Sequence, residues 1–368
     1  MRLRAYAVYL SAMLIFAASR LVVIVGINFG TLLVRIPDPK HWDAGSAWYH
    51  RLLRWDTGWY AAIVKDGYQC CAAPGVEGTT AFYPLYPLVT YAVKSLFGIN
   101  HFVALLLVAN VASLFAVLLM TKFVKDELGH EIALLSVTFF CFFPSSLFLS
   151  AGYTESLFLV FVLLSFILMA REKFVLAAAM AGLSLGTRST GIVMIPVILW
   201  EMGLRNTLPW PRFLPRMALC GVLAASGLLI YMAYLGIRFG HPLAFATVQV
   251  AWHSGTFLDR FVSAVTLASF RHGNLWDAGW FLCFLALTIW SFRRLRFTVA
   301  LYGLGTLALP YLTLGVIVNR YMLVCFPAFM CLGILCKGRP WLVSVLIGIF
   351  GALLLQTAAL FSQWYWVG

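Results

Sequence analysis

The segment best suited to chemistry sets an aspartate among aromatic residues, in RWDTGWYAAIVKDGY. Asp56 follows a long apolar run and begins a stretch with helical spacing. Trp55, Trp59 and Ile63 recur every four residues, so on a helix they form one apolar stripe that would lie flat in a membrane interface. A partly desolvated carboxylate there can take a proton from a hydroxyl group. The residues alone also allow a structural role, since aspartate is a favoured helix N-cap.

Two arginines interrupt apolar stretches, where a charged side chain is costly and commonly marks a functional site. Arg188 lies in GTRSTG, which breaks what would otherwise be one long apolar run, and Arg320 lies in NRY between two apolar segments. A guanidinium group binds phosphate oxygens through paired hydrogen bonds. We therefore expect both arginines to bind the phosphate of a donor. For Arg188 the alternative is a hairpin turn whose arginine extends to the outer interface.

Three further side chains are candidates for orienting a substrate. Glu155 lies in SAGYTES, at a tight turn where helix capping by Thr154 would also account for it. Tyr60 lies four residues after Asp56. Tyr83 precedes a proline in AFYPLYP, and proline holds the preceding residue extended. The resulting rigid aromatic patch suits either sugar stacking or an interfacial belt.

A second polar segment, HPLAFATVQVAWH, carries an amide, an indole and an imidazole. Gln249, Trp252 and His253 would share one helix face, and such groups bind sugar hydroxyls. Asp43 repeats the Trp-Asp pair and is a candidate second carboxylate of the site, although a surface turn suits it as well. The substrate-binding candidates are Trp55, Trp59, Tyr60, Tyr83, Glu155, Gln249, Trp252 and His253.

Composition places these residues in a membrane protein. Only 11% of the 368 residues are charged and 62% are hydrophobic, with a mean hydropathy of +0.92. Soluble domains have roughly a quarter charged residues, so this chain has too few charges to cover a water-facing surface. We expect an all-α, polytopic transmembrane bundle of about 11 spans, occupying 1–368 as one domain. The expected spans are 6–33, 101–121, 131–150, 155–170, 174–187, 190–204, 217–237, 276–292, 298–317, 321–336 and 341–362.

The charges predict which way this bundle faces. With the N-terminus inside, every short inside loop is basic, as the positive-inside rule requires. Two long segments, 34–100 and 238–275, then fall outside, and they are enriched in tryptophan, tyrosine and carboxylate side chains. The stretch from Tyr83 to Gly98 holds two prolines and a lysine, so we expect an interfacial helix there. The first apolar run lacks a clean cleavage site, which favours a retained helix over a signal peptide.

Several classes of protein are disfavoured. The net charge of +13 would suit nucleic-acid binding, but the basic residues form short clusters between apolar runs, which is typical of cytoplasmic membrane loops. The sequence has no glycine-rich phosphate loop of the Walker or Rossmann kind, no HExxH and no zinc spacing. We therefore expect no nucleic-acid partner, no cofactor and no metal site, and leave open whether the reaction depends on a metal.

Six motifs in chain order carry a resemblance to a known family: RWDTGWYAAIVKDGY, AFYPLYP, SAGYTESLF, GTRSTG, HPLAFATVQVAW and NRYMLVCFPAF. Together they resemble the PIG-V-type mannosyltransferases, which include the enzyme that adds the second mannose during glycosylphosphatidylinositol assembly. The resemblance implies a GT-C-like bundle and inverting transfer from polyprenyl- or dolichyl-phosphate-mannose to a lipid or glycan acceptor at the non-cytoplasmic face. It also implies a catalytic aspartate in the first outer loop, which here is Asp56.

The length of the chain is closer to that of the bacterial relatives, which implies a bacterial cell membrane with the site facing outside. In a eukaryote the site would face the lumen of the endoplasmic reticulum. A transporter or flippase of lipid-linked sugars is the first alternative, since it too would have broken helices and intramembrane charges. A non-catalytic membrane scaffold is the second. The ordered motifs favour the enzyme.

Overall fold

The computed structural model describes residues 2–37, 47–70, 77–248, 258–259, 262, 275–314 and 319–367. Within these ranges all regular structure is helical. Four helices are long and apolar enough to cross a membrane, and seven shorter apolar helices have 10–17 residues. Each expected span overlaps one of these eleven segments. The all-α, multi-pass architecture is thus confirmed, while the number of segments that cross the bilayer stays a prediction.

The helices fall into three groups by length and place. The four long helices are α1 (Arg2–Leu33), α4 (His101–Leu128), α9 (Trp210–Phe239) and α17 (Pro340–Ser362). The shorter apolar helices are α5 (His130–Phe142), α6 (Glu155–Ala170), α7 (Phe174–Thr187), α8 (Met194–Leu204), α13 (Leu275–Ser291), α14 (Phe297–Leu314) and α16 (Phe326–Cys336). The remaining α-helices described here are α2 (Asp56–Asp66), α3 (Leu85–Phe97), α10 (Ala244–Val248) and α15 (Asn319–Leu323).

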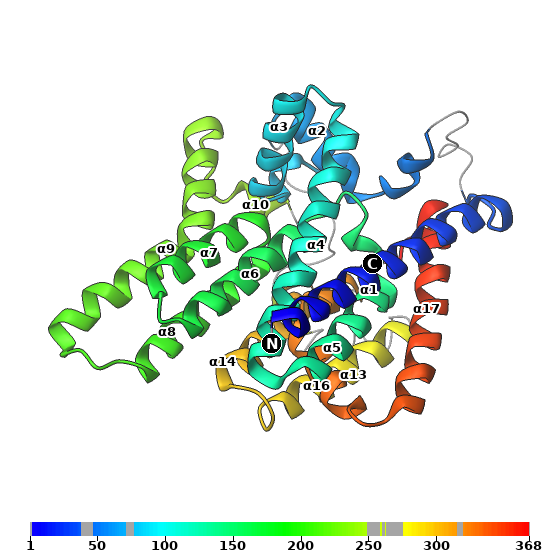
Figure 1. Ribbon diagram of the computed structural model, residues 1–368. Helices are drawn as coiled ribbons and strands as arrows, with labels where there is room; N and C mark the ends of the chain where they lie inside the picture. Colours follow the sequence, from blue (N-terminus) through cyan, green and yellow to red (C-terminus); the bar gives the residue numbers. More distant parts are fainter. Residues whose placement is uncertain are drawn as a thin grey trace.

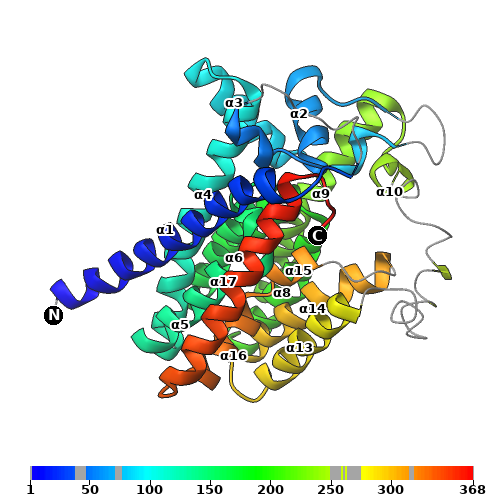
Figure 2. The same ribbon diagram turned by 90° about the vertical axis from the view of Figure 1, so that its right-hand side faces the viewer.

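One end of the bundle carries the helices of the first expected outer segment. Figures 1 and 2 show α2 and α3 together at this end, with α10 nearby. The turns that join α13 to α14 and α16 to α17 lie at the opposite end in both views. These turns hold the basic sequences RRLR and KGRP. The structure therefore separates a basic end from an end rich in aromatic residues.

Several helix ends differ from the expected bounds, mostly at prolines. Helix α5 ends at Phe142 rather than near residue 150, because Pro144 disfavours helical geometry just before it, and the 3₁₀ helix η4 (Pro144–Leu149) follows. The expected span 321–336 is divided into α15 and α16 by the turn before Pro327. Helix α9 begins at Trp210 rather than near residue 217, with Pro211 in its first turn, where proline is tolerated.

Close packing of two helices fixes the end of α7. A Cβ added at Gly227 of α9 would lie 2.1 Å from the Gly182 carbonyl oxygen and 2.3 Å from the Gly186 nitrogen of α7. Small residues of this kind let the backbones of membrane helices approach closely. The C-cap of α7 is Arg188, so this contact positions one of the two candidate phosphate-binding arginines.

A buried arginine ties α1 to the turn before α6. Arg20 donates hydrogen bonds to the Ser146 carbonyl oxygen at 2.7 Å, to the Ser150 hydroxyl at 2.9 Å and to the Cys141 carbonyl oxygen at 3.1 Å. These acceptors satisfy a charge that would otherwise be costly inside a membrane protein. The segment that they anchor leads directly to Glu155.

Replacing this arginine tests its anchoring role. Arg20→Met removes the hydrogen bonds that Arg20 donates to the Ser146 carbonyl oxygen and the Ser150 hydroxyl, so we expect a loss on the order of 1–3 kcal/mol of stability. The thermal midpoint in detergent would fall measurably. Arg293→Met, at an exposed site in the RRLR turn, is the matched control and should leave the midpoint unchanged. Equal thermal midpoints for Arg20→Met and Arg293→Met would show that Arg20 does not anchor this segment.

A second charged cluster lies at the basic end. Arg296 contacts Glu127 on α4 at 2.8 Å and Glu201 on α8 at 3.3 Å. Glu201 is largely buried, forms an ion pair with Arg205 at 2.6 Å and accepts a hydrogen bond from the Thr298 hydroxyl at 2.6 Å. The cluster joins α4, α8 and α14 far from the aromatic end, which indicates a structural role.

We expect Arg296→Gln to destabilise the protein by roughly 1–3 kcal/mol, because two carboxylates lose a cation while Glu201 stays buried. The thermal midpoint should fall, and the remaining folded fraction should keep its activity per molecule. Arg293→Gln serves as the control. A variant with a normal midpoint and low activity would instead place this cluster in the functional machinery.

Candidate active site

The first component of the site is an ion pair between α2 and α15. Asp56 is the first residue of α2, and Trp55 takes the N-cap position with φ +56°. A positive φ is rare for a bulky residue, and such backbone strain concentrates at functional sites. The Asp56 carboxylate accepts a hydrogen bond from the Arg320 guanidinium, 264 residues further along the chain. The N-cap interpretation of Asp56 is therefore wrong.

The second ion pair joins α6 to the end of α7. Arg188 lies 2.5 Å from Glu155 and donates a further hydrogen bond to the Thr154 hydroxyl at 2.9 Å. Glu155 is completely buried and Arg188 is 9% exposed. Thr154 makes no side-chain capping bond to α6, so capping does not account for this pair of residues. Arg188 is drawn inward instead of extending to an interface.

One tyrosine ring connects the two ion pairs. The guanidinium carbons of Arg188 and Arg320 lie 5.1 Å and 5.5 Å from the centroid of the Tyr321 ring. Arg320 also lies 5.5 Å from the centroid of Tyr153. Guanidinium groups at such distances are attracted to ring faces. Four charges from four distant segments thus meet at one place.

Tyr60 faces this charged centre from α2. It is 7% exposed, and its ring packs against Phe82 and Tyr86, each at 5.1 Å. Burial, and next the negative charge of Asp56, raise the pKa of the Tyr60 phenol. The hydroxyl therefore stays protonated at neutral pH and is available as a hydrogen-bond donor.

Two polar atoms at the centre are buried with no hydrogen-bond partner among the described residues. They are the second carboxylate oxygen of Glu155 and the Nε of Arg320. Buried polar groups are normally paired, and an unpaired one costs about 1–3 kcal/mol. One is an acceptor and the other a donor, so together they match a ligand that has both a hydroxyl group and an anionic oxygen.

The predicted aromatic stripe is divided between different partners. Trp55 packs edge-on against Trp366 at 5.4 Å, in the segment after α17. Trp59 stacks on Phe82 at 5.9 Å, and Ile63 is only 7% exposed. These side chains pack against protein and do not form one exposed stripe, and the interfacial position of α2 stays a prediction.

The structure places Tyr83 in an aromatic cluster with residues of α9 and α10. Its ring packs against Tyr231 of α9 at 5.6 Å and Phe245 of α10 at 5.9 Å. Burial raises the pKa of the Tyr83 phenol. The remaining sequence candidates, Asp43, Gln249, Trp252 and His253, lie outside the described residues, and their assignment stays a prediction.

The sequence candidates did not include four residues at the centre, which are Tyr153, Tyr321, Arg54 and Trp366. Tyr153 lies two residues before Glu155, and Tyr321 directly follows Arg320. This nearness to a candidate charge was the signal that could have identified the two tyrosines. Arg54 lies 4.5 Å from the ring of Trp364 and donates to the Ser362 carbonyl oxygen at 3.2 Å. This contact brings the QWYW segment, with Trp366, onto the site.

The described helices and their charged centre define a multi-pass membrane protein with the GT-C-like fold. Over 89% of this chain and 60% of the other, it superposes on the crystal structure of ArnT from Cupriavidus metallidurans bound to undecaprenyl phosphate, with a TM-score of 0.51 and 16% identity. The oligosaccharyltransferase of Archaeoglobus fulgidus aligns over 96% of this chain and 55% of that chain, with a TM-score of 0.48 and 14% identity. At these identities the likeness to ArnT shows the fold alone.

Within that class, residues 42–205 match the family model of the PIG-V mannosyltransferases. A stretch of 147 residues is 30% identical to GPI mannosyltransferase 2 of Schizosaccharomyces pombe, and it covers 38% of this chain and 30% of that protein. The resemblance to PIG-V-type mannosyltransferases is thus confirmed for the segment that holds Asp56, Glu155 and Arg188. The chain aligns with less than a third of this curated relative's length.

Proposed function

We propose that this chain transfers mannose, within the membrane, from a polyprenyl-phosphate-mannose donor to a lipid or glycan acceptor. The observation that carries the proposal is the meeting of the Asp56–Arg320 and Glu155–Arg188 pairs around Tyr321. The family match over 42–205 supports the sugar. A fold neighbour that was crystallised with undecaprenyl phosphate supports a lipid phosphate as the leaving group.

In the proposed reaction, an acceptor hydroxyl attacks the anomeric carbon of the donor sugar. Asp56 takes the hydroxyl proton through the carboxylate oxygen that does not bind Arg320. The new bond joins the acceptor oxygen to the anomeric carbon as the bond from that carbon to the phosphate oxygen breaks. Attack from the opposite face inverts the configuration, and the lipid phosphate leaves with the bonding electrons.

The arginines would stabilise the charge of the leaving phosphate. Arg320 has a buried Nε donor that has no partner in the described part of the chain, and the Arg188 guanidinium also lies against the Tyr321 ring. Donors aimed at the place where charge develops act strongly in a site shielded from water. The unpaired oxygen of Glu155 would accept a hydrogen bond from a hydroxyl of the donor sugar.

The basic turns at the opposite end support an orientation with this site on the non-cytoplasmic face. We propose a bacterial cell membrane as its location, on the sequence resemblance given above. Asp43, Gln249, Trp252 and His253 remain proposed contributors to acceptor or sugar binding, and Tyr83 would act from the neighbouring aromatic cluster.

Purified chain in liposomes with radiolabelled polyprenyl-phosphate-mannose and a panel of acceptor lipids tests this function. We expect labelled mannose on an acceptor lipid, with an anomeric configuration opposite to that of the donor. Movement of the labelled donor across the bilayer with no transferred mannose would contradict the proposal and favour a flippase.

A further inference from the structure

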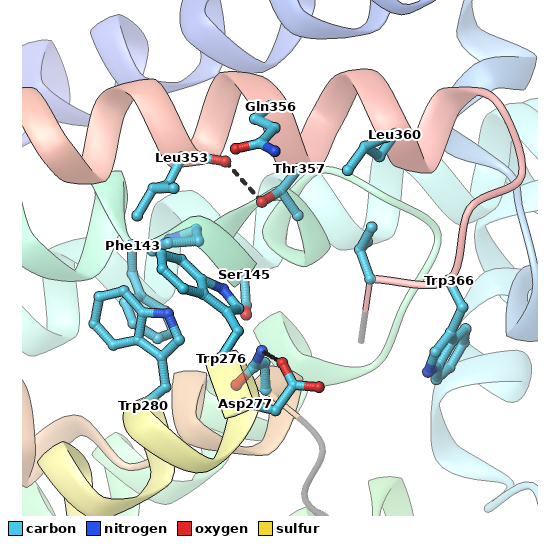
Figure 3. A pocket seen from close by; sticks show the side chains of 13 residues that line it. Phe143, Ser145, Trp276, Asp277, Trp280, Leu353, Gln356, Thr357, Leu360 and Trp366 are labelled. Atoms are coloured by element: carbon cyan, nitrogen blue, oxygen red, sulfur yellow. Dashed lines mark hydrogen bonds between the residues drawn. The ribbon is translucent and has the colours of Figure 1, made fainter. Parts of the chain in front are cut away.

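A second recess lies beside the charged centre, bounded by α13, α15, η4 and the end of α17. Its volume is about 380 Å³, near the small end of the range for ligand pockets, roughly 300–1,000 Å³. Figure 3 shows its lining, with Trp276 and Trp280 on one side and Trp366 on the other. No step of the proposed transfer described above uses this space.

The recess combines indole rings with groups that form hydrogen bonds. Trp276 and Trp280 contact each other edge to face at 5.8 Å. Asp277, Gln356 and Ser145 line the same space. Flat apolar indole faces next to a few polar side chains suit a compact ligand that has an apolar face and a polar rim. A sugar ring has such a division, because its C–H face is apolar and its rim carries hydroxyl groups.

Part of this hydrogen-bonding capacity is unused. Asn319 donates to one oxygen of Asp277, which leaves the second carboxylate oxygen as an acceptor. The Asn319 side-chain oxygen is buried with no partner among the residues that the structure describes. A hydrocarbon chain in the recess would leave these oxygens unpaired, which is unfavourable. A ligand with several hydroxyl groups would pair them.

The recess adjoins the charged centre through two shared residues. Asn319 directly precedes Arg320 in α15. Trp366 lines the recess and its ring centroid lies 5.6 Å from the Arg320 guanidinium carbon. Trp366 also packs against Trp55, which precedes Asp56. A ring held in the recess would therefore be next to the residue that is paired with the proposed base.

We propose that this recess binds a neutral sugar ring of the acceptor, with Asp277, Asn319 and Gln356 forming hydrogen bonds to its hydroxyl groups and the tryptophans covering its apolar face. This inference rests on the proposed mannose transfer for the role of the bound ring, whereas the binding itself does not depend on it. The recess thus selects a glycosylated acceptor over a lipid that lacks a sugar.

The test measures direct binding of a simple probe, methyl α-mannopyranoside, to the full chain in nanodiscs by saturation-transfer NMR. Asp277→Ala and Gln356→Leu should each weaken binding by about tenfold, as expected for the loss of a hydrogen bond to a ligand. Asp126→Asn and Trp341→Phe, at exposed sites near the basic end, are the matched controls and should bind as the wild type does.

Kinetics separate this inference from the proposed function. With a glycosylated acceptor, Asp277→Ala should raise the KM for the acceptor and leave the KM for the donor unchanged. Probe binding that depends on Asp277 in a chain without transferase activity would refute the proposed function and retain the sugar site. If Asp277→Ala and Gln356→Leu both transfer mannose with unaltered probe binding and an unaltered acceptor KM, the recess is not a sugar site. Displacement of the probe by decanol would also overturn the sugar site.

Discussion

Replacing Asp56 with asparagine is expected to lower the rate of mannose transfer by about 10²–10⁴-fold, the usual effect of removing a well-placed general base. The amide keeps the size of the side chain and can still accept a hydrogen bond from Arg320 through its oxygen. It cannot take the acceptor proton. The measurement is initial rates with saturating polyprenyl-phosphate-mannose and acceptor, on protein whose thermal midpoint has been determined.

The matched control is Asp126→Asn, because Asp126 is half exposed at the opposite end of the bundle, where it pairs with Lys122. This variant should transfer mannose at the wild-type rate. If Asp56→Asn folds normally and retains a rate within a few-fold of the wild type, the proposed base is wrong.

The second large effect concerns the buried Glu155–Arg188 pair. Glu155→Gln leaves Arg188, which is 9% exposed, without its counter-charge, and breaking a buried ion pair in this way costs about 3–5 kcal/mol. The double variant Glu155→Leu with Arg188→Met removes both charges, and apolar replacement of a buried pair is often neutral for stability. We therefore expect the single variant to be unstable and the double variant to recover much of the thermal midpoint.

Transfer should not recover with stability in the double variant. A chain without Arg188 lacks one of the two proposed phosphate donors, so its activity should stay at the background level even in well-folded protein. Thermal midpoints and transfer rates measured on the same preparations make this comparison. A double variant that is both stable and active would show that the pair serves folding alone.

Local sequence patterns predicted the helices because their physical causes are local. Apolar runs located the helices along the chain, and α2 begins at Asp56 as expected. The rule that disfavours helical geometry before proline explains the end of α5 ahead of Pro144, although the expected span continued through that proline. Helix ends are therefore predictable in principle where a proline or glycine determines them.

The partners of the charged residues were beyond local patterns. Asp56 and Glu155 each had a capping interpretation that spacing could not exclude, since a cap and an ion pair use the same residue types. Only the three-dimensional arrangement shows that Thr154 accepts its hydrogen bond from Arg188. Trp366 lies beyond the last apolar run, in a segment with no spacing that indicates chemistry, and its contact with Arg320 depends on how α17 packs.

The two ion pairs around Tyr321 are proposed to form one site for a lipid phosphate, with Asp56 as the base. Equilibrium binding of polyprenyl phosphate to purified variants tests this site. We predict that Arg188→Gln and Arg320→Gln lose this binding, whereas Asp56→Asn and the exposed control Arg293→Gln retain it. Equal affinity in all four variants and the wild type would show that Arg188 and Arg320 do not bind the lipid phosphate.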